Sequence, residues 1–303
     1  MTKYGLFLGC TTPTKVPQYE MAARWTCRRL GIELVDVGEF VCCGSNQANI
    51  TIEGGLLLSA LNMAHAEARG LDIVVLCAAC FGTLSEAAEK LRDPRLRDNV
   101  NSRLAEVGLR YEGKTRVRHI SRVFYEDVGL DRLRREAVKD LSGLKIAPHY
   151  GCHSIKPRAI SRGFDNPDHP KSLHRLIRAA GGNAVDYKTP DICCGGKTFP
   201  NSQDLTHALV ARKLDDLQAA GVDCMVVQCQ TCYLMYGPQQ ANAAKKHGKT
   251  FQVPVLLYPQ LLGLAMGADP VADLGLHLNA PSTDRLLGKI ARNAEKNWAR
   301  AAN

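Results

Sequence analysis

Hydrophobic residues occur along the chain in short continuous runs, separated by longer segments with helical periodicity. The runs LDIVVL at 71–76 and VDCMVV at 222–227 are rich in β-branched residues, as is typical of strands covered on both faces. The longer segments predict helices at Gln18–Leu30, Gly55–Arg69, Ser172–Ala180 and Leu205–Ala220. Gly31 and Gly181 directly follow two of these helices, where a left-handed cap favours glycine. The alternation of strands and helices predicts an α/β fold with mostly parallel sheets.

The same series of elements occurs twice. Each copy has a strand that ends in Gly-Cys, then a Cys-Cys-Gly, then an apolar strand that ends in Cys-x-x-Cys. These features lie at 5–10, 41–45 and 71–80, and again at 147–152, 192–196 and 222–232. The repeat predicts two duplicated domains, 1–143 and 144–303, each a small sheet flanked by helices. We expect them to be related by a pseudo-twofold, with the boundary after a charged helix at Asp131–Asp140.

The chain ends in a segment predicted to be an amphipathic helix, Asp284–Arg300. Its basic residues follow one another at three- and four-residue steps and form one stripe: Arg285, Lys289, Arg292, Lys296 and Arg300. A solvated surface is the favoured interpretation of this stripe, and docking on an acidic partner is the alternative.

Cysteine is the most informative part of the composition. The chain has 303 residues, of which 12 are Cys. No apolar run approaches the roughly 20 residues that a membrane span requires, and the start lacks the long apolar region of a secretory signal. We therefore predict a cytoplasmic protein with no membrane span. In that reducing compartment, metal ligation or redox chemistry is a better explanation of the cysteines than disulfides.

The net charge of +9 raises the question of a nucleic-acid partner. Aromatic residues make up only 6% of the chain, and no recognition-helix or RNA-binding pattern is present. The charge is better explained by solvated faces and by contacts to acidic partners. We predict no nucleic-acid binding.

Five cysteines in each half recur in the same order. In the first half they are Cys10, Cys42, Cys43, Cys77 and Cys80, and in the second they are Cys152, Cys193, Cys194, Cys229 and Cys232. A Cys-x-x-Cys turn can direct two thiolates at one centre. A Cys-Cys pair on a tight turn can supply two more, and a strand end can supply the fifth.

Five sulfurs exceed the four ligands of a structural zinc ion and the four of an ordinary cubane cluster. They favour an enlarged or opened iron–sulfur centre, or a cubane with a spare thiol, over zinc. A thioredoxin-type Cys-x-x-Cys is a weaker alternative, because such a motif needs no distant partners. Cys27 and Cys224 lie outside the pattern, and we predict that both are small buried hydrophobic residues.

The chain resembles the B-subunit of heterodisulfide reductase, which is built from a repeated CCG domain. The resemblance rests on all ten cysteines in order and on the opening GLFLGC, HYGCH at 149–153, DNP at 165–167 and the closing VPVLLYPQLLGLAMG. It implies two non-cubane 4Fe–4S clusters, one for each CCG motif, that face one another across a disulfide or thiol substrate. It also implies that a ferredoxin-like iron–sulfur subunit and an FAD-containing subunit deliver the electrons.

The stretch CCGSNQANITIEGG differs from what the methanogen protein leads us to expect. We therefore favour a complex of the sulfur-oxidising bacterial type, in which a lipoate-binding carrier protein presents the sulfur. One alternative is an electron-transfer iron–sulfur subunit of a lactate- or glycolate-type dehydrogenase complex. Another is a zinc-stabilised binding protein without a redox role.

Four polar residues are candidates for a catalytic role: His119, His149, His153 and Lys156. His149, His153 and Lys156 surround Cys152, close to the expected second cluster. His119 and Tyr258 follow matching strands in the two halves, so both are candidates to approach the centre between the domains. Satisfied loop polar groups and core packing are the alternatives for these residues.

Overall fold

The computed structural model describes residues 2–161 and 163–301. Each half of the chain forms one parallel four-stranded sheet, in the orders β2-β1-β3-β4 and β6-β5-β7-β8. The first sheet consists of β1 Thr2–Phe7, β2 Ile32–Asp36, β3 Asp72–Val75 and β4 Val117–His119. The second consists of β5 Lys145–His149, β6 Asn183–Ala184, β7 Cys224–Val227 and β8 Val255–Leu257. The identical orders confirm the predicted α/β duplication, while the division at residues 143 and 144 stays a prediction.

Helices connect and cover the strands of both sheets. Those of the first half are α1 Thr12–Lys15, α2 Pro17–Arg29, α3 Ile52–Glu67, α4 Ala78–Lys90, α5 Pro94–Leu104, α6 Ile120–Arg122 and α7 Leu130–Glu136, with short helical turns at Gln47–Asn49, Ala105–Val107 and Val123–Val128. Those of the second are α8 Cys152–Ile155, α9 Arg158–Ser161, α10 Ser172–Ala179, α11 Gln203–Ala219, α12 Gln230–Tyr236, α13 Gln240–His247, α14 Tyr258–Ala265 and α15 Asp284–Ala301, with a turn at Leu276–Leu278.

The predicted helices agree with the observed ones to within a few residues, with one exception. The charged helix was expected to reach Asp140, but α7 ends at Glu136 because Ala137 adopts an extended backbone, with φ −76° and ψ 106°. Gly31 and Gly181 have φ of +71° and +83°, which confirms the predicted left-handed caps.

The parallel register brings the cysteine-bearing loops to one edge of each sheet. Phe7 at the end of β1 pairs with Val75 at the end of β3, and His149 pairs with Val227 in the second sheet. Each of these strand ends leads directly into a cysteine segment. Ligands of open α/β sheets bind at such carboxyl edges.

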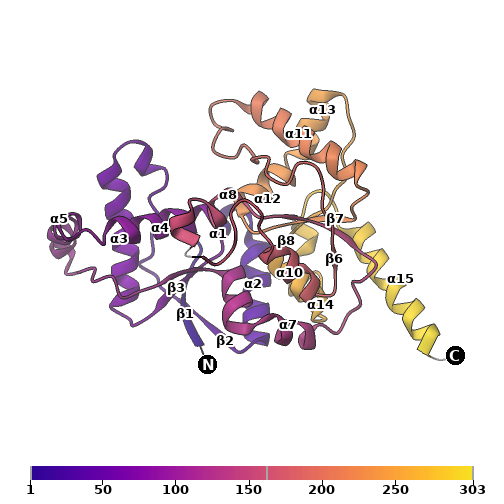
Figure 1. Ribbon diagram of the computed structural model, residues 1–303, viewed down its shortest axis with the longest axis horizontal. Helices are drawn as coiled ribbons and strands as arrows, with labels where there is room; N and C mark the ends of the chain where they lie inside the picture. The colour runs from indigo at the N-terminus through magenta and orange to yellow at the C-terminus, as the bar shows by residue number, and fades with distance from the viewer. Residues whose placement is uncertain (1, 162, 302–303) are drawn as a thin grey trace.

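The two halves pack closely against each other (Figure 1). Helix α2 of the first half packs against α14 of the second, and α4 packs against α8. In the shared core the rings of Phe124 and Tyr258 lie 6.0 Å apart, and Tyr258 donates a hydrogen bond to the Leu176 carbonyl. Tyr258 is therefore a buried core residue, which confirms the packing alternative for this residue.

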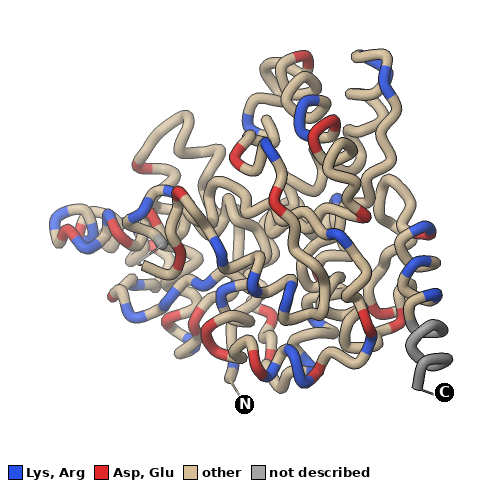
Figure 2. The backbone as a smooth tube through the Cα atoms, turned by 45° about the vertical axis from the view of Figure 1, so that its right-hand side comes forward, with Lys and Arg blue, Asp and Glu red and all other residues tan. Residues whose placement is uncertain are grey.

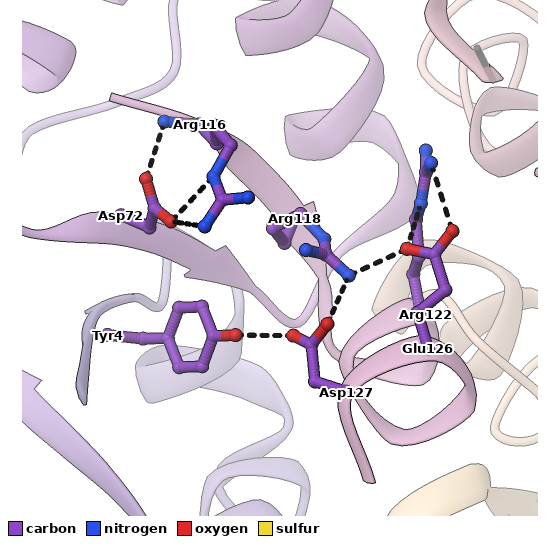
Figure 3. Close-up of polar contacts among 7 residues, drawn as sticks. All are labelled: Tyr4, Asp72, Arg116, Arg118, Arg122, Glu126 and Asp127. Atoms are coloured by element: carbon purple, nitrogen blue, oxygen red, sulfur yellow. Dashed lines mark hydrogen bonds and ion pairs between the residues drawn. The ribbon is translucent and has the colours of Figure 1, made fainter. Parts of the chain in front are cut away.

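An ion network connects strands of the first sheet with the segment that follows β4 (Figure 3). Arg118 on β4, whose side chain is 12% exposed, contacts Glu126 at 2.7 Å and Asp127 at 3.0 Å. Asp127 also accepts a hydrogen bond from Tyr4 on β1. The network therefore ties the segment that follows β4 back to the strands before it.

We expect Arg118→Gln to lower the free energy of unfolding by about 2 kcal/mol, because it leaves the half-buried Asp127 without its cation and Glu126 with Arg122 alone. Urea unfolding measures this change. Arg116→Gln is the matched control: Arg116 pairs with Asp72 from a side chain that is 64% exposed, and we expect its loss to cost under about 1 kcal/mol. Equal losses in the two variants would contradict the assigned difference in burial.

Acidic and basic residues are interspersed along most of the chain (Figure 2). In the predicted basic stripe, Lys289 forms an ion pair with Asp223 at 2.6 Å, so part of the stripe faces the chain itself. The side chains of Lys296 and Arg300 lie outside the described residues. None of the helices in the described ranges combines the length and the apolar character that crossing a membrane requires.

Candidate metal centre

Four of the five predicted ligands of the first half form a series of contacts at the carboxyl edge of the first sheet, and the fifth, Cys10, lies nearby. Cys42 contacts Cys43, Cys43 contacts Cys80, and Cys80 contacts Cys77. Cys10 is exposed, and its charge acts on Cys42. The fold therefore brings all five together.

The second half has a similar arrangement, in which all five cysteines are linked by contacts. Cys152 contacts Cys193, Cys193 contacts Cys194, and Cys194 contacts Cys232. Cys232 in turn contacts Cys229. Cys194, Cys229 and Cys232 are buried, whereas Cys152 and Cys193 are exposed.

The two sets meet at equivalent residues. The sulfurs of Cys77 and Cys229, each the first cysteine of its Cys-x-x-Cys, lie 4.0 Å apart in the buried junction between the halves. A contact between equivalent residues is what we would expect near an axis that relates the two repeats, and the twofold character of this axis stays a prediction. Nine of the ten sulfurs thus form one continuous series of contacts, which runs from Cys42 to Cys152.

In each half, a glycine directly before the first cysteine lies beside the last sulfur of the same set. A Cβ at Gly9, which has φ +66°, would lie 3.1 Å from the Cys80 sulfur. A Cβ at Gly151, with φ +73°, would lie 3.8 Å from the Cys232 sulfur. The positive φ therefore favours glycine at both positions, and at Gly9 the sulfur beside it also leaves little room for a side chain.

The first Cys-Cys turn is held by the long helix α3. On this helix, Asn62 accepts from the Val41 amide at 2.8 Å and donates to the Cys42 carbonyl at 3.1 Å. Ser59 donates to the Cys43 carbonyl at 2.8 Å. These bonds fix the direction in which both cysteines leave the turn.

Thiol contacts shift the cysteine pKa values in opposite directions. A hydrogen bond from Cys80 lowers the pKa of Cys43 to about 6, and bonds from Cys152 and Cys194 hold the pKa of Cys193 well below its usual range. The donors Cys80 and Cys152 have raised pKa values for the same reason. Each set therefore stabilises a thiolate, the form that binds metal.

Two side chains of the first half hold the second Cys-x-x-Cys in place. The Gln228 carbonyl, directly before Cys229, lies 2.9 Å from His119 Nε2 and 3.5 Å from the Tyr19 hydroxyl. The Ser121 amide donates to His119 Nδ1 at 3.3 Å, so Nε2 carries the hydrogen and donates. His119 thus contacts the centre through the backbone, and its catalytic role stays a prediction.

His119 should make stability dependent on pH. Burial lowers the pKa of His119 to about 4, whereas the unfolded chain has a value of about 6.5. Between these values only the unfolded state binds the proton, so stability is lost as the pH falls from 6.5 towards 4. At pH 5 we expect a loss of about 2 kcal/mol relative to pH 7.

Urea unfolding of the metal-free protein at pH 7 and pH 5 measures this loss, with His119→Gln as the variant that cannot titrate. The variant should lose about 2 kcal/mol less than the wild type between the two pH values. An equal loss in both would contradict the assignment, since His149, whose pKa burial also lowers, is present in each.

A cavity of about 280 Å³ adjoins the second cysteine set. It is lined by Cys152, Cys193, Cys194 and Cys232, and also by His149 and Lys156. The structure therefore places these two candidate residues beside the second set.

His153 faces a different space. A cavity of about 210 Å³ between the halves is lined by His153 and Lys197 from the second half and by Thr83, Glu86 and Lys90 on α4. Gly82 allows this approach, because a Cβ there would lie 3.2 Å from the His153 carbonyl. The four catalytic candidates are therefore distributed over three places.

Lys213 on α11 is a residue that the sequence analysis missed. It is fully buried, and its ammonium donates to the Pro190 carbonyl at 3.0 Å and contacts His149 Nδ1 at 3.3 Å. It lies on the same helix face as the buried Val210 and Leu217. The helical periodicity of the hydrophobic residues on α11 would have placed Lys213 on the buried face, and a lysine in such a position is a signal of a functional residue.

Cys27 and Cys224 are both buried, as predicted, and burial raises the pKa of the Cys27 thiol to about 12. Within residues 2–161 and 163–301, no three His, Cys, Asp or Glu side chains are arranged around a single metal ion. The sulfurs instead follow one another in series. Five gathered thiols in each half and the cavity beside the second set fit a multinuclear iron–sulfur group as ligand.

Comparison with known proteins identifies the repeats. The model of the CCG cysteine-rich domain matches residues 4–85 and 146–236. A crystal structure of a hypothetical protein from Helicobacter pylori shares the fold, with a TM-score of 0.73 at 17% identity over 93% of this chain and 52% of that one.

Curated relatives match nearly the whole length. The B-subunit of ferredoxin:CoB-CoM heterodisulfide reductase from Methanosarcina mazei is 34% identical over 96% of this chain and 97% of its own. A protein from Archaeoglobus profundus that is named as similar to the same B-subunit is 33% identical over 97% and 99%. The 8-methylmenaquinol:fumarate reductase membrane anchor subunit of Wolinella succinogenes is 28% identical over 94% and 99%. With two CCG repeats and these relatives, the chain belongs to the CCG-domain family of heterodisulfide reductase B-subunits.

Proposed function

We propose that this chain is the iron–sulfur catalytic subunit of a heterodisulfide reductase-like complex, which cleaves or forms disulfide or persulfide bonds at two non-cubane 4Fe–4S clusters. The observation that carries the proposal is the contact between the two cysteine sets at Cys77 and Cys229. Two one-electron centres this close can act together on one sulfur–sulfur bond.

Each five-cysteine set would hold one cluster, which when bound supplies one-electron redox chemistry and an iron site for sulfur. Cleavage of a disulfide breaks one S–S bond, consumes two electrons and two protons, and releases two thiols. The exposed Cys152 and Cys193 lie where a substrate could reach the second set. His149 and Lys156 line the cavity beside them and are the proposed residues for holding protons there.

The proposed electron donors are a ferredoxin-like iron–sulfur subunit and an FAD-containing subunit of the same complex. The name of the Methanosarcina mazei relative, which pairs ferredoxin with the reductase, supports a donor of the first kind. A sulfur-oxidising role with a lipoate-bound substrate, and a location in the cytoplasm, stay predictions.

Anaerobic reconstitution followed by an iron count tests the proposal. Two 4Fe–4S clusters require about eight irons per chain, and fewer than about six in a folded, reconstituted sample would contradict it. Electron paramagnetic resonance then tests the chemistry. A new signal should develop when a thiol or disulfide is added to the oxidised or reduced protein.

The alternative is an electron-transfer subunit whose clusters bind no substrate. The relative named as a fumarate reductase subunit favours it. A resonance spectrum that stays the same with every thiol and disulfide, in a sample with two intact clusters, would establish this alternative over the sulfur chemistry.

A further inference from the structure

The surroundings of the two cysteine sets differ in charge. Asn62 and Lys213 each lie twenty positions after the first cysteine of their Cys-Cys pair, so they are equivalent residues of the repeat. Both are fully buried, and both bond to the loop that leads into the pair. The first half thus has a neutral amide where the second has an ammonium group.

The neighbours of this position differ in the same sense. His149 lies three positions before Cys152, where the first half has Phe7 before Cys10. Tyr236 lies four positions after Cys232, where the first half has Leu84. At these two positions the second set therefore has a polar side chain where the first has an apolar one.

Lys213 is held as a cation without a bound carboxylate. Its ammonium lies 3.3 Å from His149 Nδ1 and 5.1 Å from the centre of the Tyr187 ring. Asp191 and Asp216 lie nearby, but within the described part of the chain neither forms an ion pair with Lys213. Burial lowers the pKa of Lys213 to about 8, so the group is mostly charged at neutral pH.

His149 lies between the Lys213 ammonium group and the cavity, because it contacts the first and lines the second. An ammonium group can only donate, so Nδ1 accepts and the hydrogen of the neutral ring lies on Nε2. This Nε2 is buried and has no hydrogen-bond partner among the described residues. His149 lines the cavity together with Cys193, Cys194 and Cys232, so the N–H is available to a sulfur atom there.

We propose that Lys213, acting through His149, is the fixed cation of the second site and makes the cluster held there the more readily reduced of the two. Positive charge and hydrogen bonds to sulfur both raise the reduction potential of iron–sulfur clusters. An electron delivered by the partner iron–sulfur protein would then reduce the cluster of the second half in preference to that of the first. The inference rests on the two clusters of the proposed function, and Lys213 acts as a positioning residue for charge.

A redox titration of the reconstituted full-length chain, followed by electron paramagnetic resonance, tests the proposal. The wild type should show two one-electron steps, and Cys194→Ser, which retains only the first cluster, should show the lower one. Lys213→Gln should make the upper step at least about tenfold less favourable, which equals about 59 mV for a one-electron couple. Lys213→Arg should retain most of the wild-type value.

The matched control is Lys188→Gln, which removes an exposed charge from the loop before Cys193 and should leave both steps unchanged. The proposal is overturned if the two wild-type clusters have equal potentials. It is also overturned if Lys213→Gln leaves the upper step in place or shifts it no further than Lys213→Arg does.

A second measurement does not depend on the clusters. In the metal-free protein, Lys213→Gln should raise the pKa of His149, because burial and the neighbouring ammonium group together lower it, whereas Lys213→Arg should leave it low. Nuclear magnetic resonance of the histidine ring measures this change, and an unchanged His149 would overturn the inference. Failure to bind iron would instead contradict the proposed function, while the His149 result would still decide the role of Lys213.

Discussion

Cys194→Ser is expected to halve the iron content, from about eight to about four irons per chain, without unfolding the protein. Cys194 is buried and contacts both Cys193 and Cys232, so its loss interrupts the second set at its middle. The first set, whose contacts lie on other elements, should retain its cluster. Disulfide turnover should fall by more than about 100-fold, because even residues outside the ligand set change the activity of metal sites 10–100-fold.

Iron analysis and visible absorbance after anaerobic reconstitution measure this loss. Cys43→Ser should give the reciprocal result, with the second cluster retained. Cys27→Ala is the control: Cys27 is buried on α2 among apolar side chains, and its loss should cost about 1 kcal/mol of stability and no iron. Full iron content in Cys194→Ser, or an equal iron loss in Cys27→Ala, would contradict the assignment of the ligands.

Much of this architecture could be predicted from the sequence, because strands buried on both faces leave a distinct pattern. Val74 and Val226 lie in continuous apolar runs that are confirmed as the central strands β3 and β7. Their parallel register dictates that the cysteines after each strand share one edge. The repeat therefore predicted both the fold and the gathering of the cysteines.

The contacts between the halves could not be predicted in the same way. His119 follows a strand as expected, but its partner Gln228 lies 109 residues away, and no periodicity relates the two. His153 adjoins Cys152 in sequence, yet it faces the cavity between the halves, because the strand-end turn directs it towards α4. Contacts between residues of different halves depend on how the two folded domains pack against each other, and the local sequence pattern contains no information on that packing.

Charge differences between the repeats were missed for another reason. Alignment of the cysteines draws attention to what the halves share, whereas Lys213 and Asn62 matter because they differ. The helix pattern around Lys213 predicts a buried position, and a buried lysine is costly unless hydrogen bonds or nearby negative charge stabilise it. Residues that break the symmetry of a duplication are therefore the ones to examine first.

Gly44→Ala is expected to lower the free energy of unfolding by about 3 kcal/mol and to abolish binding of the first cluster. Gly44 ends the first Cys-Cys-Gly with φ +92°, a conformation that side chains rarely adopt. An added Cβ would also lie 2.5 Å from the Gly55 carbonyl oxygen, a backbone atom of α3 that cannot rotate away. The turn would have to open, and Cys42 and Cys43 would leave the other sulfurs.

Substitutions at two further glycines separate the effect of the left-handed backbone from that of the clash with Gly55. Gly70→Ala has the left-handed strain alone, since its φ is +63° with no atom within 4 Å of the added Cβ, and should cost about 1 kcal/mol. Gly38→Ala has neither problem and should change stability by less than about 0.5 kcal/mol. Urea unfolding and iron analysis of the three variants measure the series. If Gly44→Ala were as mild as Gly38→Ala, the tight turn would not be what holds the paired cysteines at the centre.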